Sequence, residues 1–178
     1  MPWDLGIDLG TTFTAAAVVR DDAARMATLG DHGTAVPSVL FLKADGTMLV
    51  GEAAIRRGIE EPERVARETK RRVGDPVPVM LGGTPFAAEV LQARLLRWAV
   101  DRLSAELGEA PTSIAVTHPA SWGPYKLDLL RSAFRQVGVD APVLVPEPVA
   151  AATAYAADRP LPPGALVAVY DLGGGTFD

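Results

Sequence analysis

The chain has 178 residues, of which 48% are hydrophobic and 22% are charged, values typical of a globular protein that buries a core. Its formal net charge of −5 disfavours a generic role in binding nucleic acids or anionic membranes. It contains no cysteine, which excludes disulfides and thiolate metal sites, and no apolar run is long enough to cross a membrane. We therefore expect a soluble, cytoplasmic chain.

The first part of the chain is predicted to begin with strands. Leu5, Ile7 and Leu9 alternate with small or polar residues, and an Ala- and Val-rich run follows over 13–19. The Gly-Thr-Thr turn between them favours a hairpin. Further strands are expected over 26–29, 36–42, 48–50 and 77–81, and helices over 52–59 and 62–72.

The later part of the chain alternates between helices and strands. Apolar residues at intervals of four from Leu91 to Leu107 predict a long helix over 87–107, which Gly108 ends. We then expect a strand over 113–117, a helix over 124–137, a strand over 143–145, a helix over 148–157 and a strand over 165–171. This alternation indicates a partly parallel sheet, so the fold class is α/β with a mixed sheet flanked by helices.

One short pattern occurs near both ends of the chain. Residues 8–13 read Asp-Leu-Gly-Thr-Thr-Phe and residues 171–177 read Asp-Leu-Gly-Gly-Gly-Thr-Phe, each after a predicted strand. Such a turn offers backbone N–H groups and hydroxyls to phosphate, and the acid can hold Mg²⁺ through water. Each copy alone is also consistent with an ordinary hairpin turn, but the pair predicts two phosphate loops. Residues 4–6 repeat only Asp-Leu-Gly, and the Walker and G-x-G-x-x-G patterns are absent.

Taken together, the motifs resemble those of the seventy-kilodalton heat-shock protein family, the DnaK-type chaperones of the actin, sugar-kinase and heat-shock ATPase superfamily. They match in order over residues 7–12, 36–38, 69–71, 117–120, 147–152 and 169–178. The resemblance covers essentially the whole chain and implies a ribonuclease H-like, actin-type ATPase lobe. Its implied parts are a discontinuous core of residues 1–35 and 111–164, an inserted α+β subdomain of residues 36–110, and residues 165–178 as the first strand and phosphate loop of a second lobe outside this chain.

The resemblance implies a site for ATP or ADP with Mg²⁺. It makes Lys70 the catalytic lysine that reaches the γ-phosphate, and Glu147 a carboxylate near the attacking water. Asp8 and Asp171 are implied to act in catalysis and to hold the metal through water. The implied nucleotide-binding residues are Gly10, Thr11, Thr12, Phe13, Gly173, Gly174, Gly175 and Thr176. Without the resemblance, Lys70 belongs to a solvated basic run and Glu147 complements a helix dipole.

Pro119 is implied to be the proline switch that couples the nucleotide state to distal domains, although alone it equally suits a proline that ends a strand. The chain departs from the family pattern at two positions. Leu127 stands where the family carries the arginine that pairs with this proline, and the adjacent Lys126 is a candidate replacement. Phe13 stands where the family usually has asparagine.

The expected function is therefore ATP binding within an ATP-driven protein-folding chaperone of the stress response. The complete protein is expected to hydrolyse ATP by in-line attack of water, with no covalent intermediate. Unfolded polypeptide clients and co-chaperones are expected to bind through domains outside this chain. The chain alone is expected to bind nucleotide weakly and to turn over little or none. A sugar or metabolite kinase and an actin-like filament ATPase are the alternatives, and a regulatory relative without chaperone activity is a milder variant.

Overall fold

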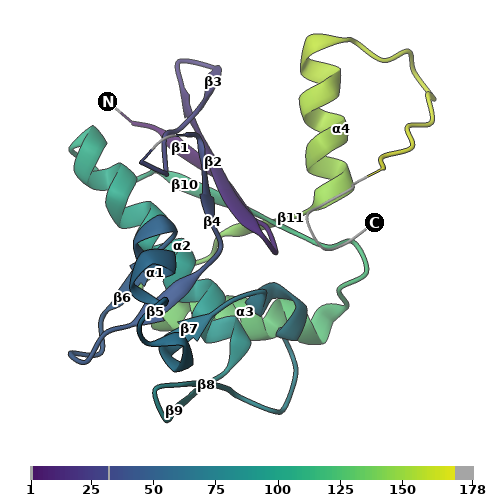
Figure 1. Cartoon of the computed structure of the whole chain (residues 1–178). Coiled ribbons are helices and arrows are strands. Elements are labelled where there is room, and N and C mark those ends of the chain that lie inside the picture. The colour runs from purple at the N-terminus through teal and green to yellow at the C-terminus, as the bar shows by residue number, and fades with distance from the viewer. Residues whose placement is uncertain (1, 32, 171–178) are drawn as a thin grey trace.

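The computed structural model describes residues 2–31 and 33–170, and the structural statements below concern those residues. Its main sheet has the strand order β11-β10-β1-β2-β3, with β4 also paired to β2 (Figure 1). The bounds are β1 Asp4–Leu9, β2 Phe13–Arg20, β3 Ala23–Met26, β4 Ala35–Pro37, β10 Ser113–His118 and β11 Val143–Pro146. Strands β1 and β2 form an antiparallel hairpin, whereas β1, β10 and β11 are parallel. The predicted mixed sheet is confirmed.

A smaller α+β unit is inserted between β4 and β10. Its strands β5, β6 and β7 form one antiparallel sheet, β8 and β9 form a hairpin, and helix α1 packs on β5 and β6. The bounds are β5 Leu40–Leu42, β6 Met48–Val50, α1 Glu52–Arg57, β7 Val65–Ala66, β8 Val79–Leu81 and β9 Thr84–Phe86. The predicted limits of the inserted segment, 36–110, stay a prediction.

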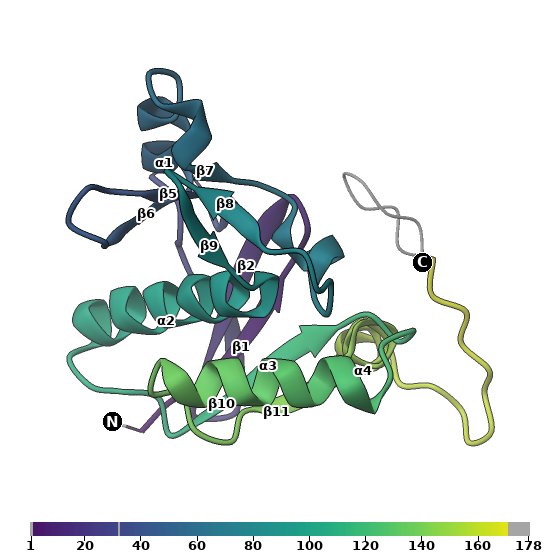
Figure 2. The same cartoon turned by 90° about the horizontal axis from the view of Figure 1, so that it is seen from below.

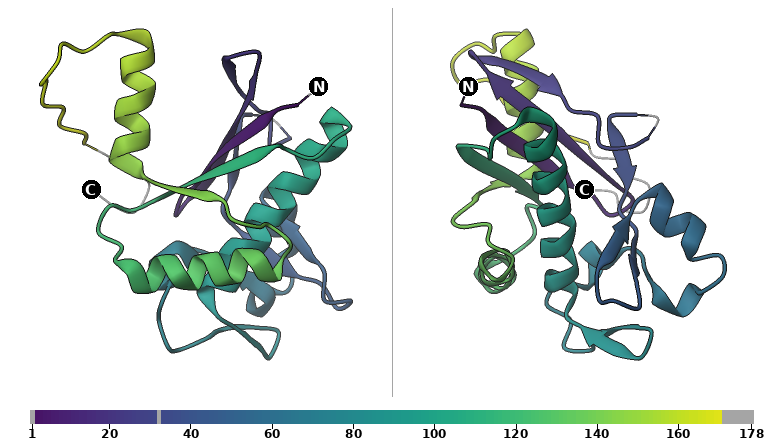
Figure 3. Two further views of the ribbon diagram at one scale, coloured as in Figure 1. Left: turned by 180° about the vertical axis from the view of Figure 1, so that it is seen from behind. Right: turned by 90° about the vertical axis from the view of Figure 1, so that its left-hand side faces the viewer.

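Three further helices flank the main sheet. Helices α2 (Ala88–Leu107) and α3 (Pro124–Gln136) lie side by side along it, and α4 (Glu147–Asp158) follows β11 and stands apart from that pair (Figures 2 and 3). The four-residue spacing buries Leu91, Leu95 and Leu103 of α2 in one core with Leu5 and Ile7 of β1. Burial of these leucines removes apolar surface from water and is the main force that holds α2 on the sheet.

Two predicted elements are wrong. Instead of a helix over 62–72, the chain forms two short 3₁₀ helices, η1 (Pro62–Arg64) and η2 (Thr69–Arg72), with β7 between them. The hydrogen bonds of β7 with β5 and the left-handed φ of 52° at Glu68 interrupt the helix. Residues 165–170 form no strand, because they pair with no other described strand, and Leu166 is fully exposed. Asp171 lies outside the described residues.

Smaller differences concern strand limits. The strand expected over 26–29 forms at 23–26, and the run 36–42 divides into β4 and β5. Val39 lies at the division, where its N–H donates to the carbonyl oxygen of Pro37 at 2.7 Å. Such a tight turn cannot continue a flat ladder, so the chain passes there from the main sheet to the inserted one.

Candidate functional site

The candidate site lies where the carboxyl ends of three parallel strands meet. Asp8 is near the end of β1, Thr117 is near the end of β10, and Glu147 follows β11 directly as the first residue of α4. In open α/β sheets this edge is where ligands bind, because loops leave the strands there and enclose a crevice. The sheet thereby brings together residues from distant parts of the sequence.

Lys70 reaches the same edge from η2. Its Nζ lies 2.5 Å from Oε1 of Glu147 and 3.9 Å from Oδ1 of Asp8. Only 7% of Lys70 is exposed, and the Glu147 side chain is 15% exposed, whereas the Asp8 side chain is 54% exposed. A buried ammonium group is stable only when it is paired with an opposite charge, so Lys70 is not part of a solvated basic face.

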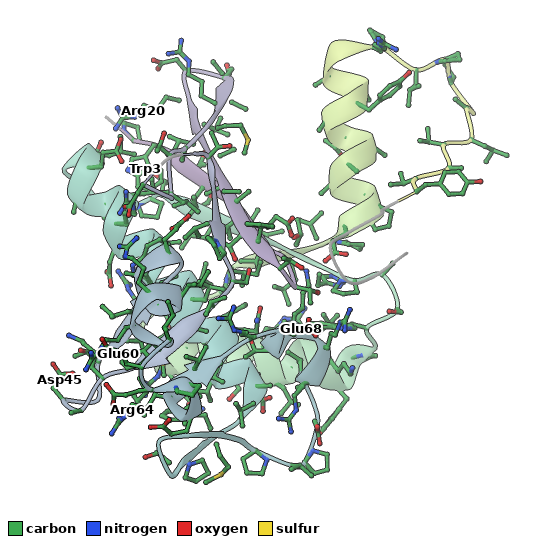
Figure 4. All side chains as sticks on the ribbon, viewed as in Figure 1. Trp3, Arg20, Asp45, Glu60, Arg64 and Glu68 are labelled. Atoms are coloured by element: carbon green, nitrogen blue, oxygen red, sulfur yellow. The ribbon has the colours of Figure 1, made fainter. Side chains whose placement is uncertain are left out.

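A buried hydrogen bond holds the turn that carries Lys70. Nε2 of Gln92, on α2, donates to Oγ1 of Thr69 at 2.7 Å, and both side chains are buried. Glu68, which is labelled in Figure 4, lies directly before this turn and has a left-handed φ of 52°. The turn is therefore anchored in the core on one side of Lys70. Sequence reasoning missed Gln92, whose signal was an amide within the apolar stripe of a long helix.

The two arginines after Lys70 behave differently from it. Arg71 contacts Glu68, and Arg72 contacts Asp75, in each case three positions away in the chain. Both arginines keep substantial exposure, as surface ion pairs do. Within this basic run it is thus Lys70 that points into the site.

The loop after β1 is closely packed. A Cβ atom added to Gly10 would lie 2.2 Å from the carbonyl oxygen of Phe13, so only glycine fits there. The buried Ser38 supports the loop from below: its Oγ donates to the carbonyl oxygen of Gly10 at 2.8 Å, and its N–H donates to that of Thr12 at 2.8 Å. Phe13 is 55% exposed. The loop is thus held in one shape, and the role of Ser38 was not foreseen.

A cleft of about 620 Å³ adjoins these groups. Its lining residues are Asp8, Thr117, Ala120, Ser121, Glu147, Pro148, Ala150, Ala151, Val169 and Tyr170. The lining combines two carboxylates, Asp8 and Glu147, with small apolar side chains of α4. The second predicted phosphate loop, with Asp171, Gly173, Gly174, Gly175 and Thr176, lies outside the described residues.

Pro119 lies directly beyond β10, next to the cleft. Its carbonyl oxygen is 2.9 Å from Nδ1 of His118 and accepts the N–H of Trp122 at 3.1 Å. Because a carbonyl only accepts, Nδ1 is the protonated nitrogen of His118. Lys126 lies over the Trp122 ring, with Nζ 5.5 Å from its centroid. Lys126 thus reaches the Pro119 turn through Trp122.

The charges of the site suit a hydrated divalent cation. Asp8 and Glu147 carry two negative charges against one positive charge on Lys70. Among residues 2–31 and 33–170, no group of three or more His, Cys, Asp or Glu side chains could enclose a metal ion. A half-exposed carboxylate such as Asp8 can instead accept hydrogen bonds from water on Mg²⁺, an ion that usually keeps several waters.

A mixed sheet flanked by helices, with this charged cleft at the carboxyl ends of its parallel strands, defines an actin-like ATPase lobe. The family model for Hsp70 proteins matches residues 4–79 and 75–178, which is nearly the whole chain. The chain belongs to the Hsp70 family, and this match supports a nucleotide-binding domain of the chaperone type. None of the described helices is sufficiently long and apolar for a membrane span.

Proposed function

We propose that this chain binds ATP with Mg²⁺ as one lobe of an ATP-driven protein-folding chaperone. The complete protein hydrolyses ATP to control its binding of unfolded polypeptides. The observation that carries this proposal is the buried ammonium of Lys70, held 2.5 Å from Glu147 and 3.9 Å from Asp8 at the carboxyl edge of the sheet. Lysine side chains are seldom buried unless they are paired, and clusters of partly buried charges in a cleft concentrate at functional sites.

Each group has a proposed role in phosphoryl transfer to water. Lys70 stabilises negative charge on the γ-phosphate, a task that suits a compact ammonium on a flexible stem. Glu147 holds that ammonium and orients the attacking water. Asp8 binds water molecules of the metal, and bound Mg²⁺ supplies neutralisation of phosphate charge. Water attacks the γ-phosphorus as the bond to the bridging oxygen breaks, and no covalent intermediate forms.

The phosphate-binding role is assigned to two loops. Gly10, Thr11 and Thr12 offer N–H and hydroxyl donors from the loop that Ser38 supports. The second loop is proposed to comprise Asp171 as a further metal-binding acid and the glycine-rich residues after it. Phe13 is one of the two positions where the chain departs from the family pattern, and its exposed side chain adds an apolar surface to the first loop.

The finer organisation follows the same proposal. Residues 1–35 and 111–164 form the core of the lobe, residues 36–110 the inserted subdomain, and residues 165–178 the start of the second lobe. Pro119 acts as the switch toward the distal domains, and Lys126 takes the place of the absent arginine. Family membership favours this chaperone over a sugar kinase or an actin-like filament protein. The proposed compartment is the cytoplasm.

The proposal is tested by substituting lysines in the complete protein. Lys70→Ala should lower the single-turnover rate of ATP hydrolysis by about 100-fold, because a charge donor to the transition state is lost. ATP affinity, measured by calorimetry, should stay within a few-fold of wild type. Lys43→Ala is the matched control, since Lys43 is half-exposed and pairs with Asp45 in a turn of the inserted unit.

Two results would contradict the proposal. Equal rates for wild type and Lys70→Ala would remove Lys70 from the reaction. A complete protein that binds no nucleotide in the presence of Mg²⁺ would refute the function itself. Glu147→Gln separates the two carboxylates: it should slow hydrolysis while the amide still accepts a hydrogen bond from Lys70.

A further inference from the structure

A second residue of the cleft holds Asp8 directly. Thr117 lies beside Asp8 because β1 and β10 pair in parallel, with Ile7 opposite Val116. Oγ1 of Thr117 donates a hydrogen bond to Oδ1 of Asp8 at 2.7 Å, and both residues line the cleft. In the sequence, Thr117 is distinguished only as part of the motif at residues 117–120.

Asp8 needs such a partner more than its neighbours do. Its side chain is 54% exposed, so packing alone leaves its carboxylate free to rotate. Thr117 is β-branched, and its rotamer is restricted on a strand, so its hydroxyl is a fixed donor. The hydrogen bond therefore restricts the rotation of the exposed Asp8 carboxylate, because its donor is fixed on a strand of the sheet.

The bond also distinguishes the two oxygens of Asp8. Oδ1 accepts from Thr117 and lies 3.9 Å from Nζ of Lys70. Oδ2 lies toward the first loop, where a Cβ atom added to Gly10 would be 3.8 Å from it. With Oδ1 engaged, Oδ2 is the oxygen directed toward the phosphate loop.

We propose that Thr117 is a positioning residue for the metal of the site: it fixes the Asp8 carboxylate so that Oδ2 accepts hydrogen bonds from water on Mg²⁺. This inference rests on the proposed function. Thr117 itself touches neither metal nor phosphate in this scheme. Partners that orient metal-binding groups matter nearly as much as the groups themselves, and losing one typically costs 10- to 100-fold in affinity or activity, an order-of-magnitude range.

The same strand pair contains a matched control. At its other end Oγ of Ser113 donates to Oδ1 of Asp4 at 2.8 Å, where Asp4 is directly opposite Ser113. The two hydrogen bonds join the same strands with the same chemical groups. Only the bond at Thr117 borders the cleft, so Ser113→Ala removes an equivalent bond without altering the site.

The experiment measures the effect of Mg²⁺ on ADP affinity in the complete protein. Calorimetry gives the ADP affinity in excess EDTA and at a series of free Mg²⁺ concentrations. Thr117→Val should raise the Mg²⁺ concentration for the half-maximal gain in ADP affinity about tenfold, with the affinity in EDTA unchanged. Thr117→Ser should restore wild-type behaviour, and Ser113→Ala should leave it unaltered. Thermal unfolding checks that each variant is folded, and Thr117→Ala replaces the valine variant if that one is not.

The outcomes separate this inference from the proposed function. A Thr117→Val protein with the wild-type Mg²⁺ dependence overturns the inference and leaves the function standing. Equal shifts in Thr117→Val and Ser113→Ala also overturn it, because the hydroxyl would then serve the sheet as a whole. If the ADP affinity of the wild-type protein does not change with the Mg²⁺ concentration, both the metal site and this inference are refuted.

Discussion

The two ends of the β1–β10 pair use the same residues for different purposes. An Asp-Leu-Gly triplet begins at Asp4 and again at Asp8, and each aspartate accepts a hydroxyl hydrogen bond from β10. At the start of β1, the buried Trp3 joins this strand to the segment before β10: its Nε1 donates to the carbonyl oxygen of Glu109 at 3.1 Å. Near the end of β1, the aspartate instead faces Lys70 and a cleft.

The difference shows that the triplet alone carries no function. Trp3 and Glu68 lie near opposite ends of β1 (Figure 4), and only the second end receives η2 and the start of α4. In a parallel pair both carboxyl ends open at the same edge, so a ligand can meet residues from several strands there. The elements packed around each end decide which aspartate serves a site.

The largest difference between the two Asp-Leu-Gly triplets of the hairpin is expected when alanine replaces the glycine of each triplet. Gly10→Ala should destabilise the protein by about 2 kcal/mol and lower nucleotide affinity, because the new Cβ would lie 2.2 Å from the carbonyl oxygen of Phe13. Gly6→Ala, the same change in the first triplet, meets Ala17 at 4.0 Å, an ordinary contact. Alanine is better than glycine within a strand, so the Gly6 variant should be neutral or more stable by about 0.5–1 kcal/mol.

Urea unfolding and ADP calorimetry measure both effects of the glycine substitutions. Equal losses in the two variants would mean that the close packing at Gly10 does not distinguish the second triplet from the first.

The next largest difference is expected between two anchoring side chains: Gln92, which holds η2 near the end of β1, and Trp3, which lies at the start of β1. Gln92→Leu leaves the buried hydroxyl of Thr69 without its donor, which should cost about 1–3 kcal/mol of stability. Because Thr69 precedes Lys70, ATP hydrolysis by the complete protein should also fall. Trp3→Phe removes the bond to Glu109 and should lower stability by a similar amount without slowing hydrolysis.

Denaturant unfolding and single-turnover rates check this pair. The comparison fails if Trp3→Phe slows hydrolysis as much as Gln92→Leu does, since the start of β1 would then influence the reaction as strongly as the anchor of η2.

The smallest effect is expected at Asp45, a third aspartate that accepts a hydrogen bond from a hydroxyl group. Its partner Thr47 lies in the same turn, between β5 and β6. Two hydrogen bonds lower the pKa of Asp45 to about 2: one from the Thr47 side chain and one from its N–H. A lowered pKa stabilises the folded state above the unfolded pKa of about 4, and this contribution is lost as the pH falls from there toward 2. Thr47→Ala should raise the pKa, which NMR titration of the Asp45 carboxyl measures. A pKa that stays at about 2 would assign the shift to the Thr47 N–H and the nearby Lys43 instead of the Thr47 hydroxyl.

Local pattern predicted some elements closely. Helix α2 was expected over 87–107 and is found at Ala88–Leu107, because its leucine spacing and Gly108 are signals within the helix itself. The segment 62–72 was expected to be helical, but its Val65 and Ala66 pair with β5, a strand distant in sequence. Such a pairing outweighs local helix propensity, and the sequence of the segment contains no signal that predicts it.

The candidate site divides in the same way. Resemblance to the family indicated Asp8, Lys70 and Glu147 as members of one site. It indicated neither the Thr117 hydroxyl that bonds Asp8, nor the buried amide of Gln92 behind Lys70. Polar residues of this kind occur throughout the chain, and their sequence context does not distinguish those that support a site.

The sequence by itself determined the family, the long helix, the first hairpin and the identities of the charged residues, because these depend on short-range order along the chain. Only the tertiary structure decided that Lys70 is buried against Glu147, that the Asp-Leu-Gly triplet at Asp8 rather than the one at Asp4 borders a cleft, and that Thr117 bonds Asp8. These facts depend on parallel strand pairing and on contacts between segments far apart in sequence. Charge and hydrogen-bond partners act through distances of a few ångströms, and those distances exist only once the sheet has formed.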